Sequence, residues 1–177
     1  MADNDFALSS FVNELRQLIA QSFPEKPIPK PGNLIKNMRG GKEPEIVEIQ
    51  RALAGRSWRV APASIFKKYN VLPLLTDTAY LYFIPAQMFC ALDFLWKADL
   101  HLERCIYNLS PYDSNGRVIS YMLERCRSLS EKQTYAVTAF FCFLRQHAFG
   151  LIADPHSMMI CDFWLNGKAE EGKGGMS

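Results

Sequence analysis

The sequence has little net charge of either sign. Its 20 Lys and Arg residues nearly balance its 18 Asp and Glu residues, which leaves a formal charge of +2 at pH 7. Nucleic-acid-binding domains usually carry a strong basic excess on one face. The charge balance therefore argues against nucleic acid as the partner, although basic residues gathered in one loop keep that alternative open.

The sequence also lacks paired cysteines. Its five cysteines are Cys90, Cys105, Cys126, Cys142 and Cys161, and no two of them have the C-x-x-C spacing. An odd number without that spacing argues against both a disulfide framework and a zinc site. Four of the five adjoin large apolar residues, where a free cysteine packs as a small hydrophobe in a reducing compartment. We expect no metal and no cofactor.

A basic start is missing from the N-terminus as well. The first ten residues contain two Asp and no Lys or Arg. An export signal begins with basic residues and continues into an apolar run. We therefore expect a cytoplasmic protein.

One long apolar run is present, from Asp77 to about Lys97, and it is long enough to span a bilayer. Gln87 and Asp93 lie within it, and a charge in hydrocarbon is costly. The flanks show no clear excess of positive charge on one side. We interpret the run as a buried core helix and expect no membrane partner.

No segment alternates as a half-buried strand does, whereas helical spacing recurs along the chain. Residues 6–23 are amphipathic at a helical period and end at Pro24. Ser130 with Gln133 forms a capping-box pattern that opens another helix, and Asp154 before Pro155 marks the start of a third. These patterns predict an all-α fold.

The predicted architecture is a single domain over residues 1–167. It contains about five to seven helices around the central helix Asp77–Lys97, which Pro85 should kink. Residues 168–177 are polar and glycine-rich, and we expect a disordered tail there.

Two loop segments are candidates for partner recognition, because loops frequently carry binding residues. Residues 24–44 are rich in Pro, Gly and Lys, which predicts an extended loop that is either packed over the surface or partly mobile. Residues 108–117 have the composition of a turn. The candidate partner-binding residues are Lys36, Arg39, Lys42, Tyr112, Asp113, Asn115 and Arg117.

Catalytic and metal-binding patterns are weak. His101, Glu103 and Cys105 alternate, and an extended segment would present them on one side as a metal site might. No second cluster completes four ligands, so we expect surface polar residues there. Cys142 or Cys161 could pair with His147 or His156, yet both cysteines lie among apolar residues, where a nucleophile is not expected. The RGGK stretch at residues 39–42 is too short for a phosphate-binding P-loop.

Asp93 is the most notable polar residue, because it lies inside the apolar run. A buried carboxylate must find a partner or become neutral, so we expect a structural pair with an Arg or a Tyr hydroxyl. Glu124, Arg125 and Arg127 are expected to form a solvated helix face.

Two blocks of the chain resemble a family of small bacterial proteins of uncharacterised function. The first block is Leu-Thr-x-x-Ala-x-x-Tyr-x-Leu-Pro-Ala and the second is Leu-Thr/Ser-x-x-Gln-x-x-Ala-x-x-x-Phe-Leu. The matching positions are Leu75, Thr76, Ala79, Tyr82, Ile84, Pro85 and Ala86, then Leu129, Ser130, Gln133, Ala136, Phe140, Phe143 and Leu144. Ile84 stands where the pattern has Leu, and the resemblance covers roughly residues 57–147. Small helical proteins of this kind resemble bacterial immunity proteins, which bind a toxin domain and block it.

The sequence thus favours a non-enzymatic interaction protein, specifically an immunity protein that binds a cognate toxin or effector. One alternative is a small enzyme with a pocket around Asp93, His101 or His147. The other alternative is a nucleic-acid-associated accessory protein.

Overall fold

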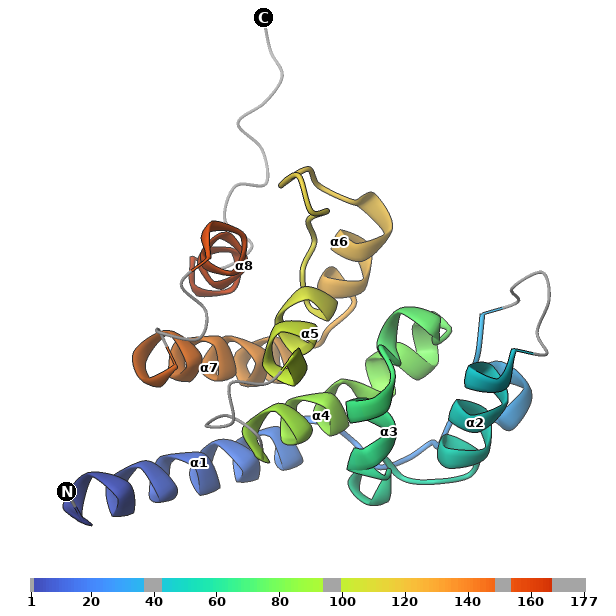
Figure 1. Cartoon of the computed structure of the whole chain (residues 1–177), viewed down its shortest axis with the longest axis horizontal. Coiled ribbons are helices and arrows are strands. Elements are labelled where there is room, and N and C mark those ends of the chain that lie inside the picture. Colours follow the sequence, from blue (N-terminus) through green and yellow to red (C-terminus); the bar gives the residue numbers. More distant parts are fainter. Residues whose placement is uncertain (1, 37–42, 94–99, 149–153, 167–177) are drawn as a thin grey trace, which may run out of the picture.

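The computed structural model describes residues 2–36, 43–93, 100–148 and 154–166. These residues form eight α-helices and no β-strand, which confirms the all-α prediction (Figure 1). The helices are α1 (Ala2–Ser22), α2 (Pro44–Leu53), α3 (Ala63–Lys68), α4 (Asp77–Asp93), α5 (Leu100–Asn108), α6 (Ser120–Arg127), α7 (Glu131–His147) and α8 (Pro155–Leu165). Three short 3₁₀ helices connect them, namely η1 (Pro31–Asn33), η2 (Trp58–Val60) and η3 (Leu72–Leu74).

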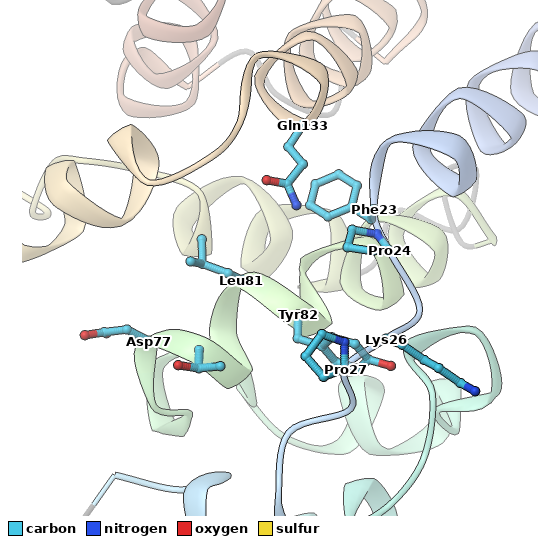
Figure 2. A pocket seen from close by; sticks show the side chains of 9 residues that line it. Phe23, Pro24, Lys26, Pro27, Asp77, Leu81, Tyr82 and Gln133 are labelled. Carbon is cyan, nitrogen blue, oxygen red and sulfur yellow. The ribbon is translucent and has the colours of Figure 1, made fainter.

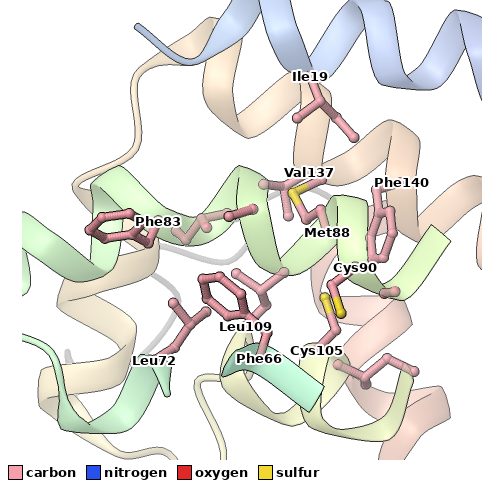
Figure 3. Packing of buried hydrophobic residues seen from close by; sticks show 14 of the residues in the cluster. Ile19, Phe66, Leu72, Phe83, Met88, Cys90, Cys105, Leu109, Val137 and Phe140 are labelled. Carbon is pink, nitrogen blue, oxygen red and sulfur yellow. The ribbon is translucent and has the colours of Figure 1, made fainter. Parts of the chain in front are cut away.

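Helix α4 lies at the centre of the bundle (Figure 1). It packs against α1, α3, α5, η2 and η3, and nearly all of its residues from Ala79 to Leu92 are buried. Contacts on every side explain why the run carries so little charge, since an exposed face would favour polar residues. Figure 3 shows how Phe83, Met88 and Cys90 of α4 meet side chains from the surrounding elements.

The structure leaves two details of the predicted central helix open. Described helix ends at Asp93, and residues 94–97 of the predicted helix lie outside the described residues. Pro85 is inside α4 and buried, and it has no N–H to donate to the carbonyl of Leu81. The kink predicted there stays a prediction.

None of the helices that the structure describes is both long and apolar enough to cross a bilayer.

Helix α7 packs against α1 on one side and α8 on another. Its start is the predicted capping box: the Gln133 amide donates to Ser130 Oγ at 3.3 Å, and the Ser130 amide donates to Gln133 Oε1 at 2.9 Å. Helix α8 also begins as predicted, because Asp154 accepts the backbone N–H groups of His156 and Ser157. Local cap chemistry therefore determines where both helices start.

Helix α5 was not predicted, and it brings the number of α-helices above the five to seven expected. His101, Glu103 and Cys105, which were expected to be surface polar residues, belong to this helix, and for Cys105 the expectation is wrong. Positions two apart lie on different faces of a helix. Accordingly Cys105 is buried in the core while Glu103 is exposed, so this segment does not form a row of metal ligands.

The first part of the 24–44 loop is packed against the bundle. Leu34 is fully buried, and Ile35 forms an antiparallel bridge with Leu75. The Lys36 amide donates to the Leu74 carbonyl at 3.0 Å, and the Thr76 amide donates to the Leu34 carbonyl at 2.9 Å. These bonds dock the loop beside the start of α4. Residues 37–42 and the predicted tail at 168–177 lie outside the described residues.

Candidate functional site

A groove of about 310 Å³ opens where α1 ends and where α4 and α7 begin. Three parts of the chain line this groove (Figure 2). The segment after α1 contributes Phe23, Pro24, Lys26 and Pro27. Helix α4 contributes Asp77, Thr78, Leu81 and Tyr82, and α7 contributes Gln133. The volume is at the lower end of the range for small-ligand pockets, about 300–1,000 Å³. Phe23, Leu81 and Tyr82 make its lining mainly apolar.

The groove is held in shape by contacts between the loop and the bundle. Tyr82 donates its hydroxyl hydrogen to the Glu25 carbonyl at 2.6 Å, and Trp58 Nε1 donates to the Pro24 carbonyl at 3.2 Å. The Glu25 side chain forms an ion pair with Arg59. The loop wall is thus fixed at two successive residues, which preorganises the groove.

Asp77 connects the groove to a buried arginine on α6. Arg125 is only 3% exposed, and its Nε donates to Asp77 Oδ1 at 2.7 Å. The guanidinium also donates to the Leu75 carbonyl at 3.1 Å and lies 4.4 Å from the centre of the Tyr80 ring. Arg125 was expected on a solvated face, and that prediction is wrong. Its neighbours Glu124 and Arg127 are exposed as expected.

Tyr121 extends this arrangement to the surface. Its ring lies 5.6 Å from the Arg125 guanidinium and 5.4 Å from Lys36 Nζ, and the residue is 54% exposed. We call Lys36, Asp77, Tyr121 and Arg125 the cation–aromatic cluster. Asp77 also lines the groove, so it is the residue that joins the cluster to the groove.

Lys36 is anchored in this cluster. Its ammonium donates to the Pro73 carbonyl at 2.9 Å. Partial burial, and then the nearby positive charge of Arg125, lower the pKa of Lys36 below its ordinary value, while Asp77 opposes this shift. The bond to Pro73 therefore holds the Lys36 ammonium beside Tyr121.

The other candidate residues from the sequence are not at this surface. Arg39 and Lys42 lie outside the described residues. Tyr112 packs its ring edge-on against Phe163 of α8, and a methyl group at Gly116 would touch Met159 of the same helix. The structure therefore places the predicted turn against α8, and no described contact joins it to Lys36.

The turn at residues 112–118 is closed by Asp113. Tyr112 and Val118 form an antiparallel bridge, and Gly116 adopts a φ of 76°, which other residues rarely adopt. Asp113 Oδ1 accepts the backbone N–H groups of Asn115 at 2.8 Å and Arg117 at 2.9 Å. The Asp113 carboxylate thus shapes the turn, and the side chain of Arg117 remains largely exposed.

The turn should loosen at acidic pH. The backbone N–H of Arg117, and to a smaller extent that of Asn115, lowers the pKa of Asp113 below its ordinary value. Asp113 therefore stabilises the folded turn fully above the pKa of an unfolded Asp, about 3.9. This stabilisation is lost as the pH falls through the lower pKa of Asp113 in the folded chain. An NMR titration of the Asn115 and Arg117 amides should report this midpoint. A midpoint at or above the ordinary value would contradict the prediction, and Asp113→Asn should abolish the titration.

Asp93 and His147, two of the three residues considered for an enzyme pocket, have structural contacts. Asp93 is exposed rather than buried, and it forms an ion pair with Arg16 of α1, so the prediction of an Arg partner is confirmed and that of burial is wrong. The His147 ring contacts Phe11 and Phe143. His101 lies in α5, and no described hydrogen bond or ion pair joins Asp93 to His147.

The cysteines and histidines considered for nucleophilic chemistry lie in surroundings that do not activate a nucleophile. Burial raises the pKa of Cys161 to about 11, which opposes formation of a thiolate. Cys142 accepts a hydrogen bond from Gln146 on its own helix, and His156 packs against Tyr107. Within the described ranges, no three His, Cys, Asp or Glu side chains gather as a metal site would require.

Asp77, Tyr121 and Arg125 were missed as site residues. A helical wheel of α6 holds a usable signal, because Arg125 follows the apolar Met122 by three residues, which places both on the same face of the helix. The partner Asp77 lies 48 positions away in sequence, so no local pattern predicts that contact.

Comparison with protein-family models, curated proteins and solved structures found no match.

Proposed function

We propose that this chain is a bacterial immunity protein that binds a cognate protein toxin or effector in the cytoplasm and neutralises it without catalysis. The observation that carries the proposal is the exposed Tyr121 ring between two fixed cations, beside a preformed apolar groove. Tyr and Arg are enriched among residues that dominate binding energy at protein interfaces. The resemblance of the two sequence blocks to small bacterial helical proteins supports the same class.

The surface around Tyr121 is rigid, which also favours binding of a protein partner. Arg125 is buried and bonded to two groups, and Lys36 is anchored by a carbonyl. A partner therefore meets an aromatic ring whose surroundings are already ordered, so little conformational entropy is lost on binding. The groove next to it can receive an apolar side chain and exclude water.

Nucleic acid is the second candidate, because cations beside an exposed aromatic ring also suit phosphate and base contacts. The exposed carboxylate of Asp77 within the cluster opposes a phosphate backbone. Electrophoretic titration with DNA and RNA at two salt concentrations separates the two functions. Strongly salt-dependent retention would favour nucleic acid.

Replacing Tyr121 by Ala is expected to weaken capture of the protein partner by about tenfold or more, as for an interface hot spot. The tagged chain would be used to capture partners from its native host, with mass spectrometric identification. The captured protein would then be expressed alone and together with this chain, and toxicity alone with rescue on co-expression is the expected result.

Tyr135→Ala is the matched control, because Tyr135 is also an exposed tyrosine on a helix but lies on α7 outside the cluster. Its variant should capture the partner as the unmodified chain does. Equal losses for both variants, or a captured protein whose expression is harmless, would overturn the proposal.

A further inference from the structure

The groove presents hydrogen-bond donors around an apolar floor. Lys26 lies at the rim, and Figure 2 shows its side chain extending outward with the ammonium at the outer edge. Thr78 and Gln133 contribute a hydroxyl and a carboxamide to the same lining. A ligand that fits must therefore bring an apolar group for the floor and an acceptor for the rim.

Gln133 is oriented by the cap of α7. Its Oε1 accepts the Ser130 amide at 2.9 Å, so this oxygen is already used. The carboxamide points from α7 into the groove (Figure 2), and no hydrogen bond described for this chain uses its Nε2. The capping box thus leaves two N–H donors for a ligand.

The nearby carboxylates are already paired with other cations. Asp77 pairs with Arg125, and Glu25 pairs with Arg59. Among the described residues, no acidic side chain forms an ion pair with Lys26. The positive charge at the rim is therefore uncompensated, and it complements an anion.

We propose that the groove binds an acidic segment of the partner protein, with one large apolar side chain on the floor, an acceptor group at Gln133 and an adjacent carboxylate at the Lys26 rim. This inference rests on the proposed function, and it specifies which chemistry the partner presents. A volume of about 310 Å³ suits a single aromatic or long aliphatic side chain. Charge-assisted hydrogen bonds from an ammonium and an amide then fix the direction of the segment.

The test uses the full chain and a fluorescein-labelled short peptide in which Phe is followed by Asp and Glu. Fluorescence anisotropy gives the affinity, and ¹H–¹⁵N NMR shows which amides respond. Lys26→Glu reverses the rim charge. Gln133→Glu keeps the cap, since Glu also completes a capping box, but removes the donor. Lys30→Glu is the control, because Lys30 is an exposed lysine of the same loop that does not line the groove.

The expected result is binding with NMR shifts centred on Leu81 and Gln133. Each groove variant should weaken binding about tenfold or more, the effect of one charge-assisted hydrogen bond, while Lys30→Glu changes it little. A peptide with Asn and Gln in place of Asp and Glu should bind correspondingly less. Equal losses for Lys26→Glu and Lys30→Glu, equal binding of the neutral peptide, or no groove shifts at millimolar peptide would overturn the proposal.

The same variants separate this inference from the proposed function. If the chain captures a toxic partner and both groove variants capture it equally well, the groove proposal fails and the proposed function stands. If the acidic peptide binds in the groove but no partner is captured, the groove chemistry is supported and the immunity function is overturned.

Discussion

Trp164→Ala is expected to lower the free energy of unfolding by about 3–5 kcal/mol, the usual cost of truncating a large core aromatic residue. Trp164 of α8 is buried, and its ring stacks on Phe141 of α7 at a centroid distance of 5.9 Å with 9° between the planes. Its Nε1 donates to the Leu109 carbonyl at 2.9 Å. One side chain therefore joins α8 to α7 and to the end of α5, and denaturation in urea should show the loss.

Trp164→Phe separates packing from hydrogen bonding at this position. It keeps an aromatic ring against Phe141 but removes the stronger of two donors to the Leu109 carbonyl, since the Cys126 thiol also donates to it at 3.8 Å, and we expect a cost of about 1 kcal/mol. The control is Phe163→Leu, since Phe163 is only half-buried on the same helix. A loss for Trp164→Ala below that for Phe163→Leu would contradict the proposed role of Trp164.

Arg125→Ala is expected to lower the free energy of unfolding by about 2–4 kcal/mol. The variant loses charge-assisted hydrogen bonds to Asp77 and to the Leu75 carbonyl, together with the stacking on Tyr80. Because Asp77 is 77% exposed, water replaces the arginine around its carboxylate, and this limits the cost. Urea denaturation monitored by circular dichroism measures the effect.

Two further variants make the Arg125 result specific. Arg125→Lys retains the charge but lacks the planar fork that reaches Asp77 and Leu75 together, so its loss should be intermediate. Arg51→Ala removes an exposed arginine from the last turn of α2 and should have little effect. If Arg125→Ala and Arg51→Ala were equally mild, Arg125 would not stabilise the start of α4.

Stability and binding can be separated within the cluster. Arg125 is buried and holds the start of α4, whereas the Tyr121 ring is half in solvent. We therefore expect Arg125→Ala to reduce both stability and partner capture, but Tyr121→Ala to act mainly on capture. This difference shows why Tyr121 is the better residue for testing function.

The sequence by itself determined the helical class and several helix starts. Ser130 with Gln133, and Asp154 before Pro155, are local cap patterns whose bonds form within one turn, so neighbouring residues suffice to predict them. The apolar run after Asp77 predicted a central helix, because a helix without a polar face must be surrounded. Helix α5 was not predicted, because the alternation of His101, Glu103 and Cys105 also fits an extended segment and the helix is only nine residues long.

Only the tertiary structure decided which side chains form the candidate site. The groove joins residues from the 23–27 segment, the start of α4 and the start of α7, and Asp77 meets Arg125 across 48 positions of sequence. The sequence pointed to Lys36 but also to a turn that the fold places against α8, and it assigned Arg125 to solvent. Helix caps depend on adjacent residues, whereas a binding surface depends on how distant helices pack, and that packing places the cations beside Tyr121.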